Sequence, residues 1–123
     1  FFVFRKHIDG QDIGYALIND KSGRETMVKS YPKPAPDGKH LLCLQAMDTL
    51  RQESTLTIYG FRQNGFVEVF EAKKTDATPT VPKWIDGKLL EIIWESTDEE
   101  NPIAPVIRQY ELRNGDWLEK LAY

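Results

Sequence analysis

A repeated turn constrains the fold of this chain more than any other feature. Asp37-Gly38-Lys39 lies one residue before the apolar run 41–44. A second copy, Asp86-Gly87-Lys88, lies 49 residues further on and comes before the apolar run 89–93. An Asp-Gly pair followed by such a run is typical of a tight turn that leads into a β-strand. The pattern therefore predicts that one structural unit occurs twice.

A second kind of turn supports the same repeat. Asn64-Gly65 and Asn114-Gly115 lie 50 residues apart, and each is flanked by β-prone segments. Asn-Gly adopts the left-handed backbone geometry of a two-residue hairpin turn with little strain. We therefore expect each unit to run as strand, long loop, strand, tight turn, strand and extended connector.

The whole pattern predicts an all-β, antiparallel protein with almost no helix. We expect the 123 residues to form a single domain, with a half-unit over about 1–30, repeat one over about 31–80 and repeat two over about 81–123. A propeller-like stack of meanders, a sandwich and an open barrel are all compatible with this repeat of about 49–50 residues. The expected strands, eight or nine in number, are 1–5, 13–18, 24–28, 40–46, 55–59, 66–72, 89–95, 106–112 and 117–123.

Proline marks the connections between these units. Three prolines fall within Tyr31–Pro36, and two more fall within Lys73–Pro82. Because proline cannot donate a ladder hydrogen bond, both segments are predicted to be extended connectors rather than central strands. In contrast, the run that begins at His40 is apolar on both alternating faces, which favours a strand at the centre of a sheet.

The first turn also carries a resemblance to a known family. Pro36-Asp37-Gly38-Lys39 followed by an apolar strand resembles the turn of β-propeller repeats of the TolB and WD40-like kind, in which each blade is a small antiparallel meander. Asp86-Gly87-Lys88 is the second copy, and the resemblance extends from about Ile13 onward. It implies a non-catalytic binding scaffold and transfers no active-site residue to this chain.

Composition excludes several functional classes. The chain has 16 Lys and Arg against 19 Asp and Glu, without the clustered basic face that nucleic-acid binding needs. No apolar run reaches the length of a membrane-spanning helix. The single cysteine, Cys43, excludes an internal disulfide. Since the chain opens on Phe1 rather than methionine, we expect an upstream segment such as a signal peptide, which slightly favours a periplasmic or secreted protein.

Two groups of residues suggest a catalytic or metal site, but their spacing along the chain argues against it. His40 and Cys43 would make a nucleophile and its base, but residues three apart in a strand point to opposite faces. We expect Cys43 to be a buried core residue instead. His7, Asp9 and Asp12 form a small polar cluster without the spacing of a metal site. We predict no metal and no cofactor.

The acidic and aromatic residues form no recognisable catalytic motif. The loop Asp98-Glu99-Glu100-Asn101 lacks the regular oxygen spacing that wraps a calcium ion. The carboxylate pairs fall on strands with no sign of a cleft between them. Aromatic residues are more often core or cross-strand partners than a sugar platform. The pairs are Glu68 with Glu71 and Glu91 with Glu95, and the aromatics are Trp84, Trp94, Trp117, Phe61, Phe66 and Phe70.

Two long polar loops are the best candidates for function. Met47–Ser54 and Ser96–Ala104 hold the same place in each repeat, so we expect both to emerge on one side and to bind another protein. A concrete version is a small bacterial inhibitor or immunity-type protein that inserts an acidic loop into a partner's basic cleft. The alternatives are a carbohydrate-binding or hydrolase domain that uses surface tryptophans and carboxylates, and a structural fragment of a longer β-propeller. The predicted partner-binding residues are Asp48, Arg51, Glu53, Asp98, Glu99, Glu100 and Asn101.

Overall fold

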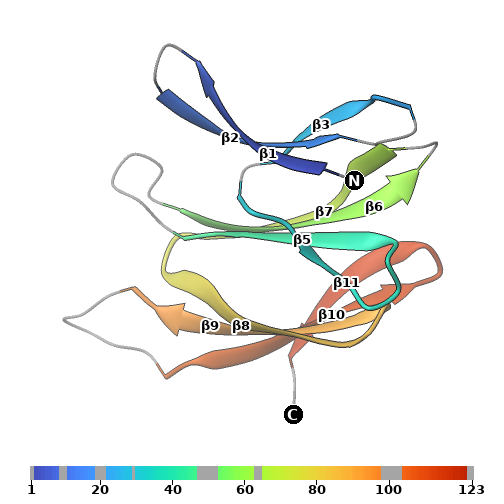
Figure 1. The fold of residues 1–123 in the computed structure, drawn as a ribbon. Coiled ribbons are helices and arrows are strands. Elements are labelled where there is room, and N and C mark those ends of the chain that lie inside the picture. The colour runs from blue at the N-terminus through green and yellow to red at the C-terminus, as the bar shows by residue number, and fades with distance from the viewer. Residues whose placement is uncertain are drawn as a thin grey trace.

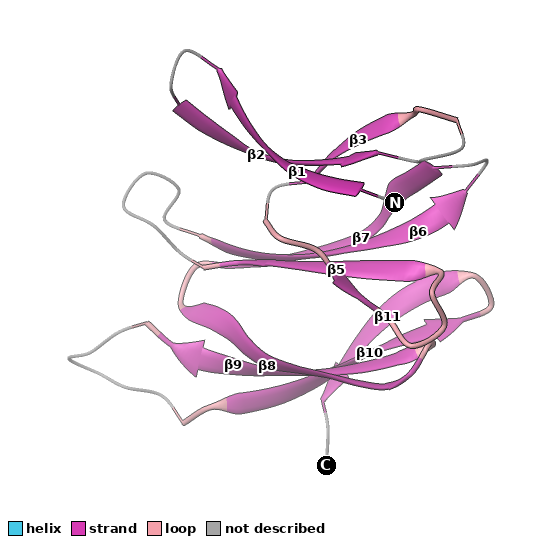
Figure 2. Ribbon diagram, viewed as in Figure 1, coloured by secondary structure: helices cyan, strands magenta, loops and turns pink. Residues whose placement is uncertain are grey.

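The computed structural model describes seven segments of the chain. They are residues 2–8, 11–18, 22–28, 30–46, 53–62, 65–97 and 104–121, with side chains described from Tyr15 to Lys120 within them. Every regular element in these segments is a β-strand, as Figure 2 shows. Every strand pairing is antiparallel. The predicted all-β fold of antiparallel meanders is therefore confirmed.

The strands form three sheets that lie one above another (Figure 1). The N-terminal sheet holds β1 (Phe2–Ile8), β2 (Gln11–Ile18) and β3 (Glu25–Val28). The middle sheet holds β4 (Lys33–Pro34), β5 (His40–Gln45), β6 (Ser54–Arg62) and β7 (Gly65–Lys74). The C-terminal sheet holds β8 (Ala77–Asp86), β9 (Leu89–Ser96), β10 (Val106–Arg113) and β11 (Asp116–Leu121).

The middle sheet is apolar on both faces because it packs between the other two. Leu41 and Cys43 of β5 pack toward the N-terminal sheet, and Leu42 packs toward the C-terminal sheet. β5 also lies between β4 and β6 in its own sheet, as its two-sided apolar pattern predicts. The cluster toward the N-terminal sheet is Leu17, Val28, Leu41, Cys43, Tyr59 and Phe66. The cluster toward the C-terminal sheet is Leu42, Leu56, Ile58, Leu90, Ile92, Trp94, Tyr110 and Trp117.

Strand register makes the sequence repeat a structural one. Leu41 pairs with Tyr59 in the middle sheet, and Leu90 pairs with Tyr110 in the C-terminal sheet. The hairpin of β6 with β7 corresponds in the same way to the hairpin of β10 with β11, so that Phe66 matches Trp117. The corresponding residues face the preceding sheet in both units. The sheets therefore stack head to tail, each with the same face toward its predecessor.

The outer face of the C-terminal sheet differs from the matching face of the middle sheet. Where the middle sheet buries Leu42 and Ile58, the register places Glu91 and Gln109, which hydrogen-bond to each other at 3.3 Å. Ile107 corresponds to Leu56 and is 42% exposed. This outer face is therefore part polar.

The prediction that residues 73–82 form a connector is wrong for most of that segment. β7 continues to Lys74 and β8 starts at Ala77, so the connector is Thr75-Asp76. Pro79 is accepted because β8 is the edge strand of its sheet, where a missing N–H costs little. The pairing of β8 with β9 shifts register between Thr80 and Lys83. Together with the two-residue β4, this strand raises the count to eleven among the described residues.

Candidate functional site

The described ends of both long loops meet at the corner between β7 and β8. The Thr97 N–H donates to the Asp76 carbonyl at 3.1 Å, so the chain leaving β9 is held to this corner. The hydroxyls of Ser54, at the start of β6, and Thr78, in β8, lie 3.3 Å apart. Both loops therefore leave the sheet stack at the same end, as the repeat predicts.

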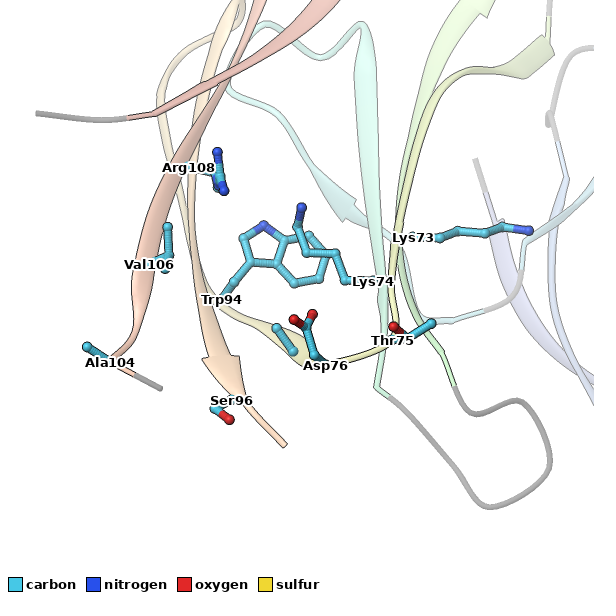
Figure 3. Close-up of a pocket in the computed structure, with 10 residues that line it drawn as sticks. Lys73, Lys74, Thr75, Asp76, Trp94, Ser96, Ala104, Val106 and Arg108 are labelled. Carbon is cyan, nitrogen blue, oxygen red and sulfur yellow. The ribbon is translucent and has the colours of Figure 1, made fainter. Parts of the chain in front are cut away.

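A cavity of about 390 Å³ opens at this corner, between the middle and C-terminal sheets. This volume falls within the usual range for ligand pockets, about 300–1,000 Å³. In Figure 3, Lys74 extends toward Trp94 while Lys73 points to the other side. The cavity is lined by Lys73, Lys74, Thr75, Asp76, Ala77, Trp94, Ser96, Ala104, Val106 and Arg108.

A chain of hydrogen bonds holds the floor of this cavity. Trp94 Nε1 donates to the Tyr110 hydroxyl at 2.8 Å, and that hydroxyl donates to Glu119 Oε1 at 2.6 Å. Lys74 Nζ lies 3.3 Å from the same carboxylate oxygen and 5.0 Å from the centre of the Trp94 ring. The buried groups of Trp94 and Tyr110 are thus satisfied, and the indole is fixed in place.

Tyr110 stays protonated in this network. Burial raises the pKa of its hydroxyl above the usual 10, and the hydrogen bond to the Glu119 carboxylate raises it further. The hydrogen bond from Trp94 and the positive charge of Arg108 oppose this rise. Tyr110 therefore serves as a fixed donor rather than as an acid or base.

Arg108 is the unusual residue of the cavity. It lies on the inward face of β10, between Val106 and the buried Tyr110. Its Nε is buried and has no hydrogen-bond partner among the residues that the structure describes. In the middle sheet the corresponding position is Thr57, a small side chain. Buried donors without a partner are rare in folded proteins, so this arginine needs an explanation beyond packing.

Most of the predicted partner-binding residues lie outside the described residues. Glu53 is described, and its carboxylate lies 3.7 Å from Lys73 Nζ, which also pairs with Glu71 at 3.2 Å. This pair lies on the side of β7 away from Lys74 and Trp94, so it places the end of the first loop on the face of the middle sheet opposite the cavity. The predicted residues outside the described segments are Asp48, Arg51, Asp98, Glu99, Glu100 and Asn101.

The opposite end of the stack brings the two Asp-Gly turns together. Asp37 Oδ1 accepts a hydrogen bond from the Lys39 N–H at 2.8 Å, and Asp37 Oδ2 lies 2.9 Å from His40 Nδ1. A second cavity, of about 500 Å³, lies here. Burial alone would raise the pKa of Asp37, but the hydrogen bonds from Lys39 and His40 outweigh it and hold that pKa below 3.8. The second cavity is lined by Asp37, Lys39, His40, Asp86, Gly87, Lys88 and Leu112.

The structure does not bring His40 and Cys43 together as a dyad. The Cys43 thiol is 3% exposed and donates to the Ser30 carbonyl at 3.4 Å, and burial raises its pKa. The His40 ring packs edge-on against Trp117 at 5.3 Å between ring centres. Cys43 is therefore a buried core residue, as strand alternation predicts.

The remaining candidates for chemistry have structural partners or lie outside the description. Trp94 and Trp117 are 2% and 7% exposed in the core. Phe61 and Phe66 form a cross-strand pair with ring centres 5.3 Å apart. Asp9 and the side chains of His7 and Asp12 are not described. In the described part of the chain no three His, Cys, Asp or Glu residues form a group that could hold a metal ion.

Sequence reasoning missed the cationic side of the cavity. Lys74 and Arg108 received no role because no motif contains them. A usable signal was present, since Arg108 falls at an inward position of a strand that alternates Val106, Arg108, Tyr110 and Leu112. A charge on a buried face indicates either an ion pair or a binding site.

Comparison of the chain with protein-family models, with curated proteins and with solved structures gave no match. The described residues include no helix long and apolar enough to cross a membrane.

Proposed function

We propose that this protein is a non-enzymatic protein-binding module whose loop end contacts another protein. The observation that carries the proposal is the meeting of both loop ends at the β7–β8 corner, beside an open cavity. Loops held by a rigid sheet scaffold are a common way to present binding residues. The packed interface below the corner supplies that rigidity.

In its concrete form the proposal is a small bacterial inhibitor or immunity-type protein. Its acidic loop, residues 98–101, enters a basic cleft of the partner, while the cavity accepts a group from the partner's surface. Charge complementarity of this kind directs association and sets specificity.

Partner capture with a loop variant tests the proposal. The immobilised wild-type protein is expected to retain one specific protein from the source cells, and Glu99→Gln/Glu100→Gln is expected to lose it. Glu91→Gln/Glu95→Gln is the matched control, because β9 places both carboxylates on the outer face of the C-terminal sheet. Equal retention by the loop variant, or no retained protein, would contradict the proposal.

A second candidate is a structural segment of a longer β-propeller. It is favoured by the head-to-tail stacking, in which the same positions of each unit face the preceding sheet. Sequencing the full natural gene tests it. The expected result is further Asp-Gly-Lys turns at the same spacing of 49–50 residues. A sugar-binding or hydrolytic function stays a prediction, tested by tryptophan fluorescence with a panel of sugars.

A further inference from the structure

We propose that the corner cavity binds a carboxylate carried by an acidic segment of the partner protein, with Arg108 and Lys74 as its cationic contacts. The inference rests on the proposed protein-binding function and names the chemistry that the cavity recognises. Arg108 carries the argument, because its buried Nε has no partner among the described residues.

An arginine of this kind matches a carboxylate better than other ligands. The guanidinium is planar and always charged, and it binds the two oxygens of a carboxylate with parallel hydrogen bonds. A buried N–H without a partner carries a desolvation cost that such a ligand would recover. Lys74, which already contacts Glu119, supplies a second positive charge at the same wall.

The rest of the lining selects the kind of anion. Trp94, Val106, Ala77 and Ala104 give the cavity apolar walls, which suit a carboxylate on an aliphatic stem. Asp76 also lines the cavity, and its charge disfavours a doubly charged phosphate more than a singly charged carboxylate. A glutamate side chain of a partner protein fits both conditions.

The repeat shows that this site is specific to one interface. Tyr59 and Tyr110 correspond, and each is the cross-strand partner of a glutamate, Glu68 or Glu119. The residue that differs beside them is Thr57 in the middle sheet against Arg108 in the C-terminal sheet. The same scaffold therefore carries a cation at one sheet interface and a neutral hydroxyl at the other.

Peptide titration followed by NMR of the Arg108 Nε–H tests the site directly. The probes are acetyl-Ala-Glu-Glu-Ala-amide, its Gln-Gln counterpart and inorganic phosphate. The glutamate peptide is expected to shift the Arg108 signal saturably, and the glutamine peptide to leave it unchanged. Arg108→Gln is expected to weaken binding at least about tenfold, the usual effect of losing one charge-assisted hydrogen bond. Arg108→Lys keeps the charge and is expected to weaken it less.

Arg113→Gln is the matched control. Arg113 lies on the same strand, faces outward and contacts Glu111 at the exposed surface, so its loss is expected to leave peptide binding unchanged. Thermal unfolding of each variant confirms that it is folded. Equal shifts from the glutamine peptide, phosphate binding as tight as the glutamate peptide, or full binding by a folded Arg108→Gln protein would overturn the carboxylate site.

Partner capture distinguishes failure of the carboxylate site from failure of the proposed protein-binding function. If wild type and Arg108→Gln retain the captured protein equally, the carboxylate site is wrong and the binding function stands. If the glutamate peptide binds at Arg108 but no protein is captured, the site stands and the proposed function is wrong.

Discussion

Gly38 and Gly87 occupy the same position in two copies of one turn but are required for different reasons. Gly38 has φ +69°, and a Cβ there would meet nothing within 4 Å. A Cβ on Gly87 would lie 2.6 Å from the Asp37 Cβ, because the two turns touch. The first glycine is needed for its backbone conformation and the second for space.

Gly87→Ala is therefore expected to destabilise the protein by about 1–3 kcal/mol through overpacking against Asp37. In an Asp37→Gly background the same substitution is expected to cost much less, because the obstructing side chain is absent. Urea unfolding of the four proteins gives the coupling between the two positions. Additive costs would show that the turns do not touch in solution.

The Asp37 carboxylate is expected to make stability depend on acid pH. Because its pKa in the folded protein lies below 3.8, its contribution is present above that pH and is lost as the pH falls through the folded value. Asp37→Asn is expected to flatten the fall in unfolding free energy between about pH 5 and pH 2. Asp86→Asn is the control, since Asp86 accepts the equivalent bond from the Lys88 N–H. Equal flattening by both variants would contradict the role of His40.

Tyr110→Phe is expected to cost about 1–3 kcal/mol, because it leaves the buried Trp94 N–H without an acceptor. Tyr59→Phe at the corresponding position is expected to cost less than about 0.5 kcal/mol. The register gives Tyr59 no tryptophan of this kind, because Gln45 stands where the C-terminal sheet has Trp94. Chemical denaturation of both variants measures the difference, and similar costs would argue against the Trp94–Tyr110–Glu119 network.

At the scale of the element, β8 shows how an edge strand accommodates residues that a central strand rejects. It contains Pro79 and Pro82, and between them Val81 has φ +47°. A β-branched residue with positive φ is strained. The pairing of β8 with β9 shifts register between Thr80 and Lys83, on either side of this residue.

Val81→Gly is expected to raise the unfolding free energy by up to about 1 kcal/mol, since strain is relieved and little buried surface is lost at 63% exposure. Ile85→Gly in the same strand is expected to lower it, because Ile85 has no positive φ to relieve. Thermal unfolding of the Val81→Gly and Ile85→Gly variants measures the two changes in stability. Destabilisation of equal size by both variants would contradict strain at Val81.

The elements that sequence predicts well are those whose signals are local. Nine of the strands follow from alternation and from the Asp-Gly and Asn-Gly turns. β8 was missed because Pro79 and Pro82 indicate a connector, although β8 forms a hairpin with β9 across the turn at Gly87 and Lys88. The role of Arg108 was missed for a different reason, since most of the residues that line the cavity with it come from β7, β8 and β9, which are distant from it along the chain. Loop convergence was predictable because it follows from the repeat.

At the scale of the whole molecule, position in the stack decides what a residue contributes. Leu56 and Ile107 correspond in register, but Leu56 is fully buried between sheets and Ile107 is 42% exposed. Leu56→Ala is expected to cost about 2–5 kcal/mol, and Ile107→Ala below about 1 kcal/mol. Equilibrium unfolding of both variants measures this. A large cost at Ile107 would show that something covers the outer face in solution.

The contact between the two turns also has a consequence for how such a chain can grow. The aspartate of one Asp-Gly pair lies against the glycine of the next, so each pair brings both the side chain that projects and the space that receives it. A tandem duplication of one unit would supply the matching aspartate and glycine at the new junction. The Asp-Gly pair therefore still fits its own copy after a gene duplication. A mutation of either residue in one copy, in contrast, requires a compensating mutation in the neighbouring copy.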